Sequence, residues 1–212
     1  MSLRVERISA AGPEEDVLRE AAGMIKAGLV VVCPTDTGYA FAANALDEKA
    51  VRRVFALKGR SFSNPVHVAV PSMEEADKYA HLNAAVFKLA RRFLPGALTL
   101  VLPRKETVPD LLVAGMPSVG IRVPDNKAVL ALAGMCGLPL TATSANISGR
   151  PTPYSGDEVM ARMGADAEVA LVLDQGEISS RELSTIVDLT ADRPRLLRQG
   201  LIPWEEVLQV LR

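Results

Sequence analysis

One segment, LVVVC at residues 29–33, restricts the possible folds of this chain more than any other. Its apolar side chains follow one another without the polar alternation of a strand that has one face in water. Such a run predicts a strand that is buried on both faces of a sheet. Residues 14–27 carry apolar side chains at helical spacing, and Gly28 follows where a left-handed helix cap is expected. We therefore expect a helix that leads into a buried strand, and Pro34 should end that strand.

Strand and helix signals alternate irregularly along the rest of the chain. Apolar and β-branched runs predict strands at 39–43, 66–70, 97–102, 119–123, 138–143, 169–173 and 184–189. Capping residues and apolar spacing predict helices from Asp47 to Gly59, from Ser72 with a break and restart at Asn83, near 125–136 and 155–163, and in the closing segment PWEEVLQVLR. Because the alternation is irregular, the pattern predicts an α/β fold with a twisted, mixed open sheet and packed helices.

The composition is that of a compact globular protein. Of the 212 residues, 49% are apolar and 23% are charged, and no repeat, low-complexity tract or long linker divides the chain. We therefore expect residues 1–212 to form a single domain. The sequence has no secretion signal and no apolar run of about 18 residues, which excludes a membrane span and indicates a cytoplasmic protein. Cys33 and Cys136 lie in separate apolar runs, where buried free thiols are expected rather than a disulfide.

The charge balance disfavours general adhesion to nucleic acids or to an anionic membrane. Lys and Arg together number 24, Asp and Glu number 25, and the formal net charge is −1. Aromatic residues make up only 4% of the chain, so the stacking surface of a single-strand binder is poorly supplied. A local basic patch is still compatible with these totals.

Polar and basic residues follow several predicted strands, where open α/β sheets commonly place their ligands. PTDTGY at 34–39 supplies two hydroxyl groups and a carboxylate, and KGRSFSNP at 58–65 places Lys58 and Arg60 around a glycine. A turn alone would account for the residues of the first segment. For the cations of the second segment, pairing with a helix C-terminus and binding of an anion both stay open, and the apolar strand that follows favours the binding site. His67 lies inside a predicted strand, where a packed histidine is the usual case.

Arg122 is the candidate with the clearest physical argument. It lies in the otherwise apolar segment SVGIRVP at 118–124, and a buried cation must pair with a counter-charge or meet a ligand. Its guanidinium suits bidentate contact with a carboxylate or a phosphate. TATSANISGRPTP at 141–153 adds hydroxyl and amide groups with little bulk, and Ser184 and Arg198 stand in two later segments. These segments together predict one polar, cationic pocket.

No familiar motif for a covalent nucleophile or a metalloprotease accompanies these residues. The chain contains no CxxC, HExxH, GxSxG, GxGxxG or Walker GxxxxGK[ST] pattern. Several cations with neutral hydroxyl groups suit transfer chemistry that works by positioning and charge stabilisation.

Taken together and in this order, seven segments resemble the YrdC/Sua5 family, the threonylcarbamoyl-AMP synthases that begin the formation of threonylcarbamoyladenosine in tRNA. They run from about Gly28 to Gly200 and read PTDTGY, KGRSFSNP, LPGALTLVL, SVGIRVPDN, TSANISGRPTP, STIVDLT and LLRQG. The resemblance implies a twisted α/β sheet with a large concave cavity, in the short form without an appended C-terminal domain. It also implies synthesis of L-threonylcarbamoyl-AMP and pyrophosphate from L-threonine, bicarbonate and ATP, with Mg²⁺ accompanying the ATP.

The resemblance assigns residues of this chain to two substrates. On the ATP side it implies Lys58, Arg60, Asn64, Ser118, Ser144, Asn146, Thr152 and Arg198, with Lys58 and Arg60 as the catalytic pair that stabilises phosphate charge. On the threonine side it implies Thr35, Thr37, Arg122, Ala142, Ser184 and His67, with Arg122 on the amino-acid carboxylate. No protein ligand for a metal is implied. The chain departs from the usual pattern at GYAF, where VYGL is more common, and at His67, which lies two positions before the histidine of many archaeal members.

Two other readings of the same segments stay open. One is the YciO-like branch of the superfamily, against which the retained KGR and SAN segments argue. The other is a non-catalytic RNA-binding module that uses the same concave surface. The near-neutral charge and the scarce aromatic residues count against this module, so binding to tRNA or double-stranded RNA is only weakly indicated. A synthase would also be expected to serve the downstream tRNA threonylcarbamoyl transferase machinery, and no membrane partner is expected.

Overall fold

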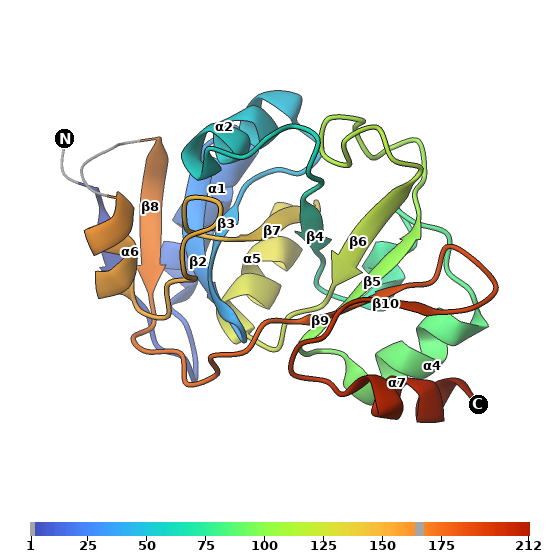
Figure 1. Ribbon diagram of the computed structural model, residues 1–212. Helices are drawn as coiled ribbons and strands as arrows, with labels where there is room; N and C mark the ends of the chain where they lie inside the picture. Colours follow the sequence, from blue (N-terminus) through green and yellow to red (C-terminus); the bar gives the residue numbers. More distant parts are fainter. Residues whose placement is uncertain (1–2, 164–167) are drawn as a thin grey trace.

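The computed structural model describes residues 3–163 and 168–212, and in them ten strands form one twisted sheet with helices packed on it (Figure 1). The strands are β1 (Val5–Arg7), β2 (Val30–Thr35), β3 (Gly38–Ala42), β4 (His67–Ala69), β5 (Leu98–Pro103), β6 (Ser118–Arg122), β7 (Leu140–Ser144), β8 (Val169–Asp174), β9 (Thr185–Asp188) and β10 (Arg195–Arg198). The helices are α1 (Glu15–Lys26), α2 (Glu48–Lys58), α3 (Met73–Ala76), α4 (Ala84–Phe93), α5 (Lys127–Cys136), α6 (Gly156–Met163) and α7 (Trp204–Leu211).

The strand order in the sheet is β1-β8-β2-β3-β7-β4-β6-β5-β9-β10. The pairs β1–β8, β2–β8, β4–β6 and β5–β9 are parallel, and the remaining neighbours are antiparallel. The sheet is therefore mixed, which confirms the fold class expected from the irregular alternation of strands and helices.

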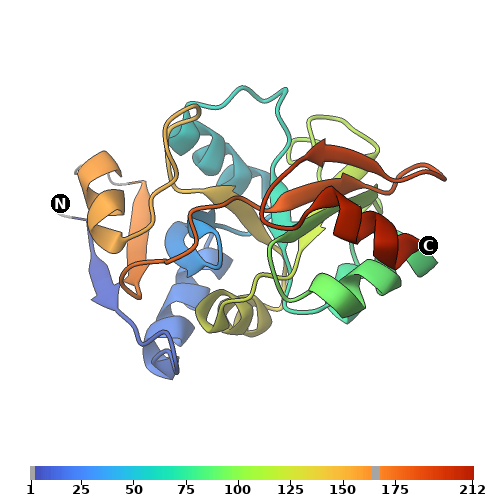
Figure 2. The ribbon, with the colours of Figure 1, turned by 60° about the horizontal axis from the view of Figure 1, so that its bottom comes forward.

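The half of the sheet that contains β2 is covered by helices on both faces. Val31 and Cys33 point into a core formed with α1 and α5, whereas Val30 and Val32 point into a second core formed with α2 and α6. Figure 2 shows α1 lying beside α5 under this half. The unbroken valine run is thus explained, because successive side chains of a strand alternate between faces and both faces are apolar here.

The other half, made of β4, β6, β5 and β9, packs one face against α4 and α7, which lie side by side (Figure 1). Every second residue of these strands enters that core, as Val68, Leu100 and Ile121 do. The residues between them face the opposite side of the sheet. This second face carries His67, Thr99 and Arg122, and it positions the candidate site.

Strand β7 joins the two halves. Thr143 and Ser144 pair with β3, whereas Leu140, Thr141 and Ala142 pair with β4. One short strand therefore belongs to both ladders, and the loop that follows it begins where the halves meet.

Capping contacts confirm several predicted helix boundaries. Asp47 accepts a hydrogen bond from the Lys49 N–H at the start of α2, and Gly59 ends that helix in the left-handed conformation. Ser72 caps the short α3, and Asn83 caps the restarted helix α4. Cys33 and Cys136 are buried free thiols, as expected.

The prediction that Pro34 ends its strand was wrong, because β2 continues to Thr35. Pro34 pairs with Tyr39 in the β2–β3 hairpin, whereas the parallel pairing with β8 extends only to Val32. The missing N–H of Pro34 therefore lies where one side of β2 needs no ladder bond.

Two short edge strands were not anticipated. β1 and β10 have three and four residues, and charged side chains occupy much of each. Short charged strands are typical of protected sheet edges and carry little periodic signal. Within residues 3–163 and 168–212, no helix has both the length and the apolar surface required to cross a bilayer.

The two-layer packing makes a stability prediction. Leu100→Ala should lower the free energy of unfolding by about 2–5 kcal/mol, because Leu100 is fully buried against α4 and α7 and its loss leaves a cavity. Leu197→Ala is the matched control, since 53% of the surface of Leu197 is exposed. This substitution should change the free energy of unfolding by less than about 0.5 kcal/mol. Urea unfolding measures both variants, and equal losses would contradict the assignment of the core.

Candidate active site

A cavity of about 170 Å³ opens over the polar face of β4, β6 and β5. Its walls carry many of the residues singled out in the sequence: Thr35, Thr37, Arg60, His67, Arg122, Ala142, Ser144, Thr152, Ser184 and Arg198. These residues come from several separate segments of the chain. The fold therefore gathers them at one place, as the strand-end pattern predicted.

Strand alternation explains how β6 serves both the core and the cavity. Val119 and Ile121 are buried in the core, whereas Ser118, Gly120 and Arg122 share the opposite face. Arg122 enters the cavity from the end of this strand. The charged residue in an otherwise apolar segment is thus the cavity-facing member of an alternating strand.

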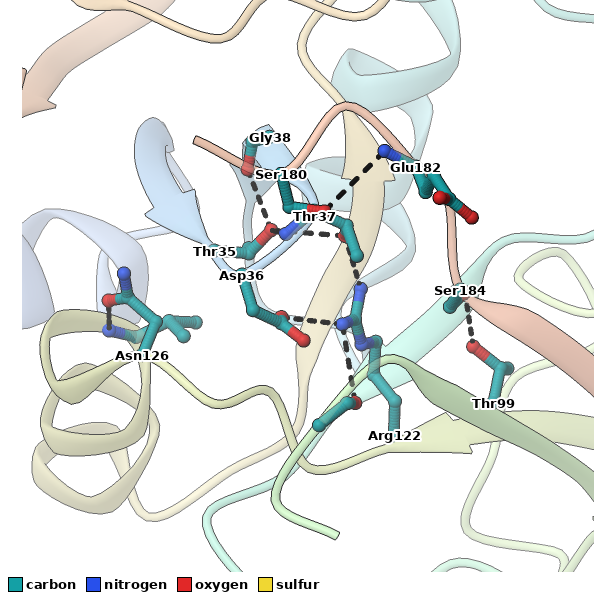
Figure 3. Close-up of polar contacts among 12 residues, drawn as sticks. Thr35, Asp36, Thr37, Gly38, Thr99, Arg122, Asn126, Ser180, Glu182 and Ser184 are labelled. Carbon is teal, nitrogen blue, oxygen red and sulfur yellow. Dashed lines mark hydrogen bonds and ion pairs between the residues drawn. The ribbon is translucent and has the colours of Figure 1, made fainter. Parts of the chain in front are cut away.

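Arg122 is held by the segment after β2 (Figure 3). Its Nη1 donates to Thr37 Oγ1 at 2.8 Å, and its Nη2 donates to Asp36 Oδ1 at 2.6 Å. The Thr37 N–H donates to Thr35 Oγ1 at 3.1 Å, and Thr35 Oγ1 in turn donates to the Gly38 carbonyl at 2.6 Å. The Thr37 hydroxyl group therefore contacts the guanidinium directly, and the Thr35 hydroxyl group holds Thr37 in position.

Asp36 is a contributor to the site that sequence reasoning did not assign. Its pairing with Arg122 is nearly buried, with side-chain exposures of 14% and 9% respectively. One atom of each group, Asp36 Oδ2 and Arg122 Nε, is buried without a hydrogen-bond partner among the described residues. The available signal was the carboxylate between two threonines, together with the requirement that a buried arginine have a counter-charge.

Arg198 is oriented by the loop that leads into β9. Its Nε and Nη2 donate to the Ser184 carbonyl at 3.0 and 2.8 Å, and Nη2 also donates to Ser184 Oγ at 2.9 Å. Ser184 Oγ shares a second hydrogen bond of 2.9 Å with Thr99 Oγ1 (Figure 3). Thr99, which the sequence analysis did not assign, lies on the cavity face of β5 between two core leucines.

Arg60 is oriented by its own loop. Its Nε donates to the Asn64 carbonyl at 3.1 Å and its Nη2 to the Pro65 carbonyl at 2.9 Å. Asn64 itself is exposed, and Ser118 is half-buried at the start of β6. Neither Asn64 nor Ser118 is among the described residues that line the enclosed cavity, although Ser118 shares the cavity face of its strand.

Lys58 lies behind the cavity rather than in its wall. The side chain is only 2% exposed, and its ammonium donates to the carbonyls of Ser144 and Asn146 at 2.6 and 3.0 Å. A third contact of 3.5 Å reaches Asn146 Oδ1, and the Ser148 N–H donates back to the Lys58 carbonyl. Burial, with a smaller effect from Arg60, lowers the pKa of Lys58 to about 8. Lys58 and Asn146 therefore hold the SAN loop in place.

The electrostatic character of the cavity is positive. Arg60 and Arg198 use neutral oxygens as partners, so their charges are not cancelled, and among the described residues Arg122 alone of the three pairs with a carboxylate. Burial is the largest cause of the lowered pKa of His67, which is about 4, and the charges of Arg198, Arg60 and Arg122 add to it. His67 is therefore a neutral imidazole at pH 7, and the cavity suits an anionic ligand.

The pKa of His67 leads to a prediction about pH and stability. Between pH 6.5 and pH 4 the unfolded chain takes up a proton at this histidine while the folded chain does not, so the free energy of unfolding should fall as the pH is lowered across this window. The His67→Gln variant has no titrating group at position 67, so its free energy of unfolding should fall less steeply as the pH is lowered. Urea titrations of both proteins at several pH values measure the difference, and parallel curves would contradict the lowered pKa of His67.

The contacts of Lys58 lead to a second prediction. Lys58→Met should lower the free energy of unfolding by about 1–3 kcal/mol, because the buried Asn146 carbonyl loses the ammonium as its donor and the Ser144 carbonyl keeps only the Asn146 N–H. Amide exchange should become faster at residues 145–150. Lys49→Met, on the exposed side of the same helix, is the control and should change neither quantity. Unchanged loop exchange in Lys58→Met would show that the loop does not depend on this ammonium.

The sequence is also similar to those of known proteins. Residues 23–200 match the family model of Sua5, YciO and YrdC, described as "Telomere recombination". A threonylcarbamoyl-AMP synthase of Pyrococcus abyssi is 41% identical over 199 residues, which cover 93% of this chain and 58% of that protein. This chain therefore spans somewhat more than half the length of that relative.

Solved structures agree with the sequence match. The crystal structure of P. abyssi Sua5 complexed with L-threonine superposes with a TM-score of 0.93 at 39% identity, covering 98% of this chain and 60% of that one. The crystal structure of E. coli YciO superposes with a TM-score of 0.85 at 27% identity, covering 95% of this chain and 97% of that one. Because residues 23–200, which are most of the chain, match the family model, the chain belongs to the Sua5/YciO/YrdC family.

Proposed function

We propose that this chain is a threonylcarbamoyl-AMP synthase, which makes L-threonylcarbamoyl-AMP and pyrophosphate from L-threonine, bicarbonate and ATP. The observation that carries the proposal is the convergence of Arg60, Arg122 and Arg198 on one cavity that also holds a neutral histidine. All the substrates of this reaction carry negative charge, in a carboxylate, a bicarbonate or a triphosphate. The relatives named as synthases support the same assignment.

The threonine subsite is assigned to the inner part of the cavity. Arg122 lies there with the hydroxyl groups of Thr35 and Thr37, and the guanidinium is directed by its contacts with Asp36 and Thr37. An arginine fixed in this way suits an amino-acid carboxylate, because less conformational entropy is lost on binding. Ala142, Ser184 and His67 complete the proposed threonine subsite.

ATP is assigned to the outer part of the cavity and its mouth. The cavity volume of about 170 Å³ is below the ~300–1,000 Å³ of pockets that enclose drug-sized ligands. We therefore expect a nucleotide to extend beyond this space, toward Asn64 and Ser118, which the resemblance assigns to the ATP side. We assign Arg60, Ser144, Thr152 and Arg198 to the phosphates and ribose, and Asn64 and Ser118 to contacts at the mouth. Lys58 and Asn146 act by holding the loop that carries Ser144.

The reaction follows from this placement. The threonine amine forms a bond to the carbon of the bicarbonate unit, which gives a carbamate and releases water. A carbamate oxygen then attacks the α-phosphorus of ATP, the bond from that phosphorus to the bridging oxygen breaks, and pyrophosphate leaves with the electron pair. No protein nucleophile is needed. The arginines stabilise the charge that develops on the phosphate oxygens.

Magnesium fits this site only as a companion of ATP. Among the described residues Asp36 is already paired with Arg122, and no group of three or more acidic, histidine or cysteine side chains could hold a metal ion. Mg²⁺ would be held mainly by phosphate oxygens, as is common for nucleotide complexes, and would supply further charge neutralisation there. The labile product would pass to a downstream transferase that acts on tRNA.

The proposal is tested by substrate omission. Pyrophosphate should form only when ATP, L-threonine and bicarbonate are all present with Mg²⁺. Release that does not change when threonine is left out would contradict the proposed function. If the chain were instead an RNA-binding module, it would bind tRNA in a steeply salt-dependent way and make no ATP-dependent product, so a salt titration accompanies the assay.

The cationic residues make a sharper test. Arg60→Ala and Arg122→Ala should each lower kcat/KM by about 10²- to 10³-fold. Each substitution removes a fixed positive charge of the protein that binds a substrate or stabilises the transition state. Arg19→Ala is the control, since this exposed arginine on α1 pairs only with Glu15 of its own helix among the described residues. Circular dichroism checks that each variant is folded, and wild-type rates in folded Arg60→Ala would remove that residue from the site.

A further inference from the structure

The backbone conformation at Gly120 does not require a glycine. It lies in the middle of β6, where its backbone is ordinary extended strand rather than the left-handed conformation that requires glycine. Glycine within a strand weakens it, because the residue has more conformational freedom to lose and no side chain to pack. Something other than local geometry must therefore account for Gly120.

The space above Gly120 is occupied by His67. A β-carbon at position 120 would lie 2.4 Å from His67 Cδ2, 2.8 Å from Cγ and 3.0 Å from Nε2. Ordinary carbon contacts are about 3.5–4.0 Å, so a methyl group at position 120 would displace the ring by roughly 1 Å. The imidazole thus lies directly on the backbone of β6.

Strand register explains this contact. Val68 pairs with Ile121 and Ala69 with Arg122, so His67 lies beside Gly120 on the same face of the parallel pair. On its other side His67 pairs with Ala142 of β7. One row across the sheet therefore reads Ala142, His67, Gly120, with a single large side chain between two minimal ones. His67 and Ala142 are both in the cavity wall, so this row is the floor of the cavity.

We propose that Gly120 is a specificity-determining residue of the amino-acid subsite, because it lets the His67 ring lie against β6 and so sets the depth of that subsite. The inference rests on the proposed function. The floor row is the least charged part of a cavity whose other walls carry three arginines. The methyl group of threonine is therefore accommodated over Ala142 and the neutral imidazole, while the carboxylate faces Arg122.

The consequence is a change in selectivity when the floor is raised. Threonine differs from serine by one methyl group, and a single such group in a tight pocket changes kcat/KM by about 10- to 200-fold. Gly120→Ala should raise the KM for threonine at least about tenfold and lower the ratio of threonine to serine turnover by a similar factor. The KM for ATP should stay within about twofold of the wild-type value, because the nucleotide binds at the other end of the cavity.

A double-mutant cycle separates this role from a general effect on the strand. In the His67→Ala background the ring is absent, so adding Gly120→Ala should cause no further change in the KM for threonine. Gly134→Ala is the matched control: Gly134 is an exposed glycine of α5, and a β-carbon added there would meet no atom within 4 Å, so its kinetics should equal the wild type. An unchanged threonine KM in Gly120→Ala, or an equal loss in both backgrounds, would overturn the proposal.

A structural measurement keeps this inference distinct from the proposed function. In the wild-type protein, nuclear Overhauser effects should connect the His67 ring Cδ2–H to the Gly120 Hα protons, whatever the enzyme makes. If that contact is seen and pyrophosphate release does not need threonine, the proposed function fails and the packing stands. If threonine-dependent release is seen and Gly120→Ala keeps its selectivity, the inference about Gly120 fails and the proposed function stands.

Discussion

A strand has only two faces, and in β4, β5 and β6 one of them is fully committed to the core against α4 and α7. Every residue between the core positions must then face the other way. The intervening residues include His67, Thr99, Gly120 and Arg122, and of these His67, Thr99 and Arg122 line the cavity. The site is therefore not added to the fold as a separate loop assembly. It is the remaining half of the same alternation that builds the core.

The cations of the site have two roles, because they hold loops of the chain in place and also supply positive charge. Lys58, Arg60 and Arg198 all donate to neutral oxygens of nearby loops, which fixes the loops without cancelling the positive charge. Arg122 differs because Asp36 neutralises part of its charge and sets its direction. Since uncompensated charge in a partly closed space attracts counter-ions, the same contacts that order the loops also prepare the cavity for anions.

Sequence reasoning succeeded where a local physical signal was strong. The valine run, the Asp47 and Asn83 caps and the glycine at the end of α2 were identified because each is explained by a few neighbouring residues. The extension of β2 through Pro34 was missed, because it depends on how far β8 runs alongside. The location of Lys58 behind the cavity also could not be read from the chain, since the carbonyls that surround its ammonium lie 86 and 88 residues away in sequence. Resemblance could assign Lys58 to a substrate, but only three-dimensional contacts show which atoms it touches.

Strand β7 fixes a distance. Ala142 pairs with β4 beside His67, and Ser144 pairs with β3 at the start of the loop that Lys58 holds. They are two positions apart on extended backbone, which corresponds to about 6.4–6.8 Å along the strand. Because both residues are hydrogen-bonded into the sheet, this spacing is set by backbone geometry and does not depend on flexible side chains. The sheet therefore fixes the distance between the inner part of the cavity, at Ala142, and the outer part, at Ser144.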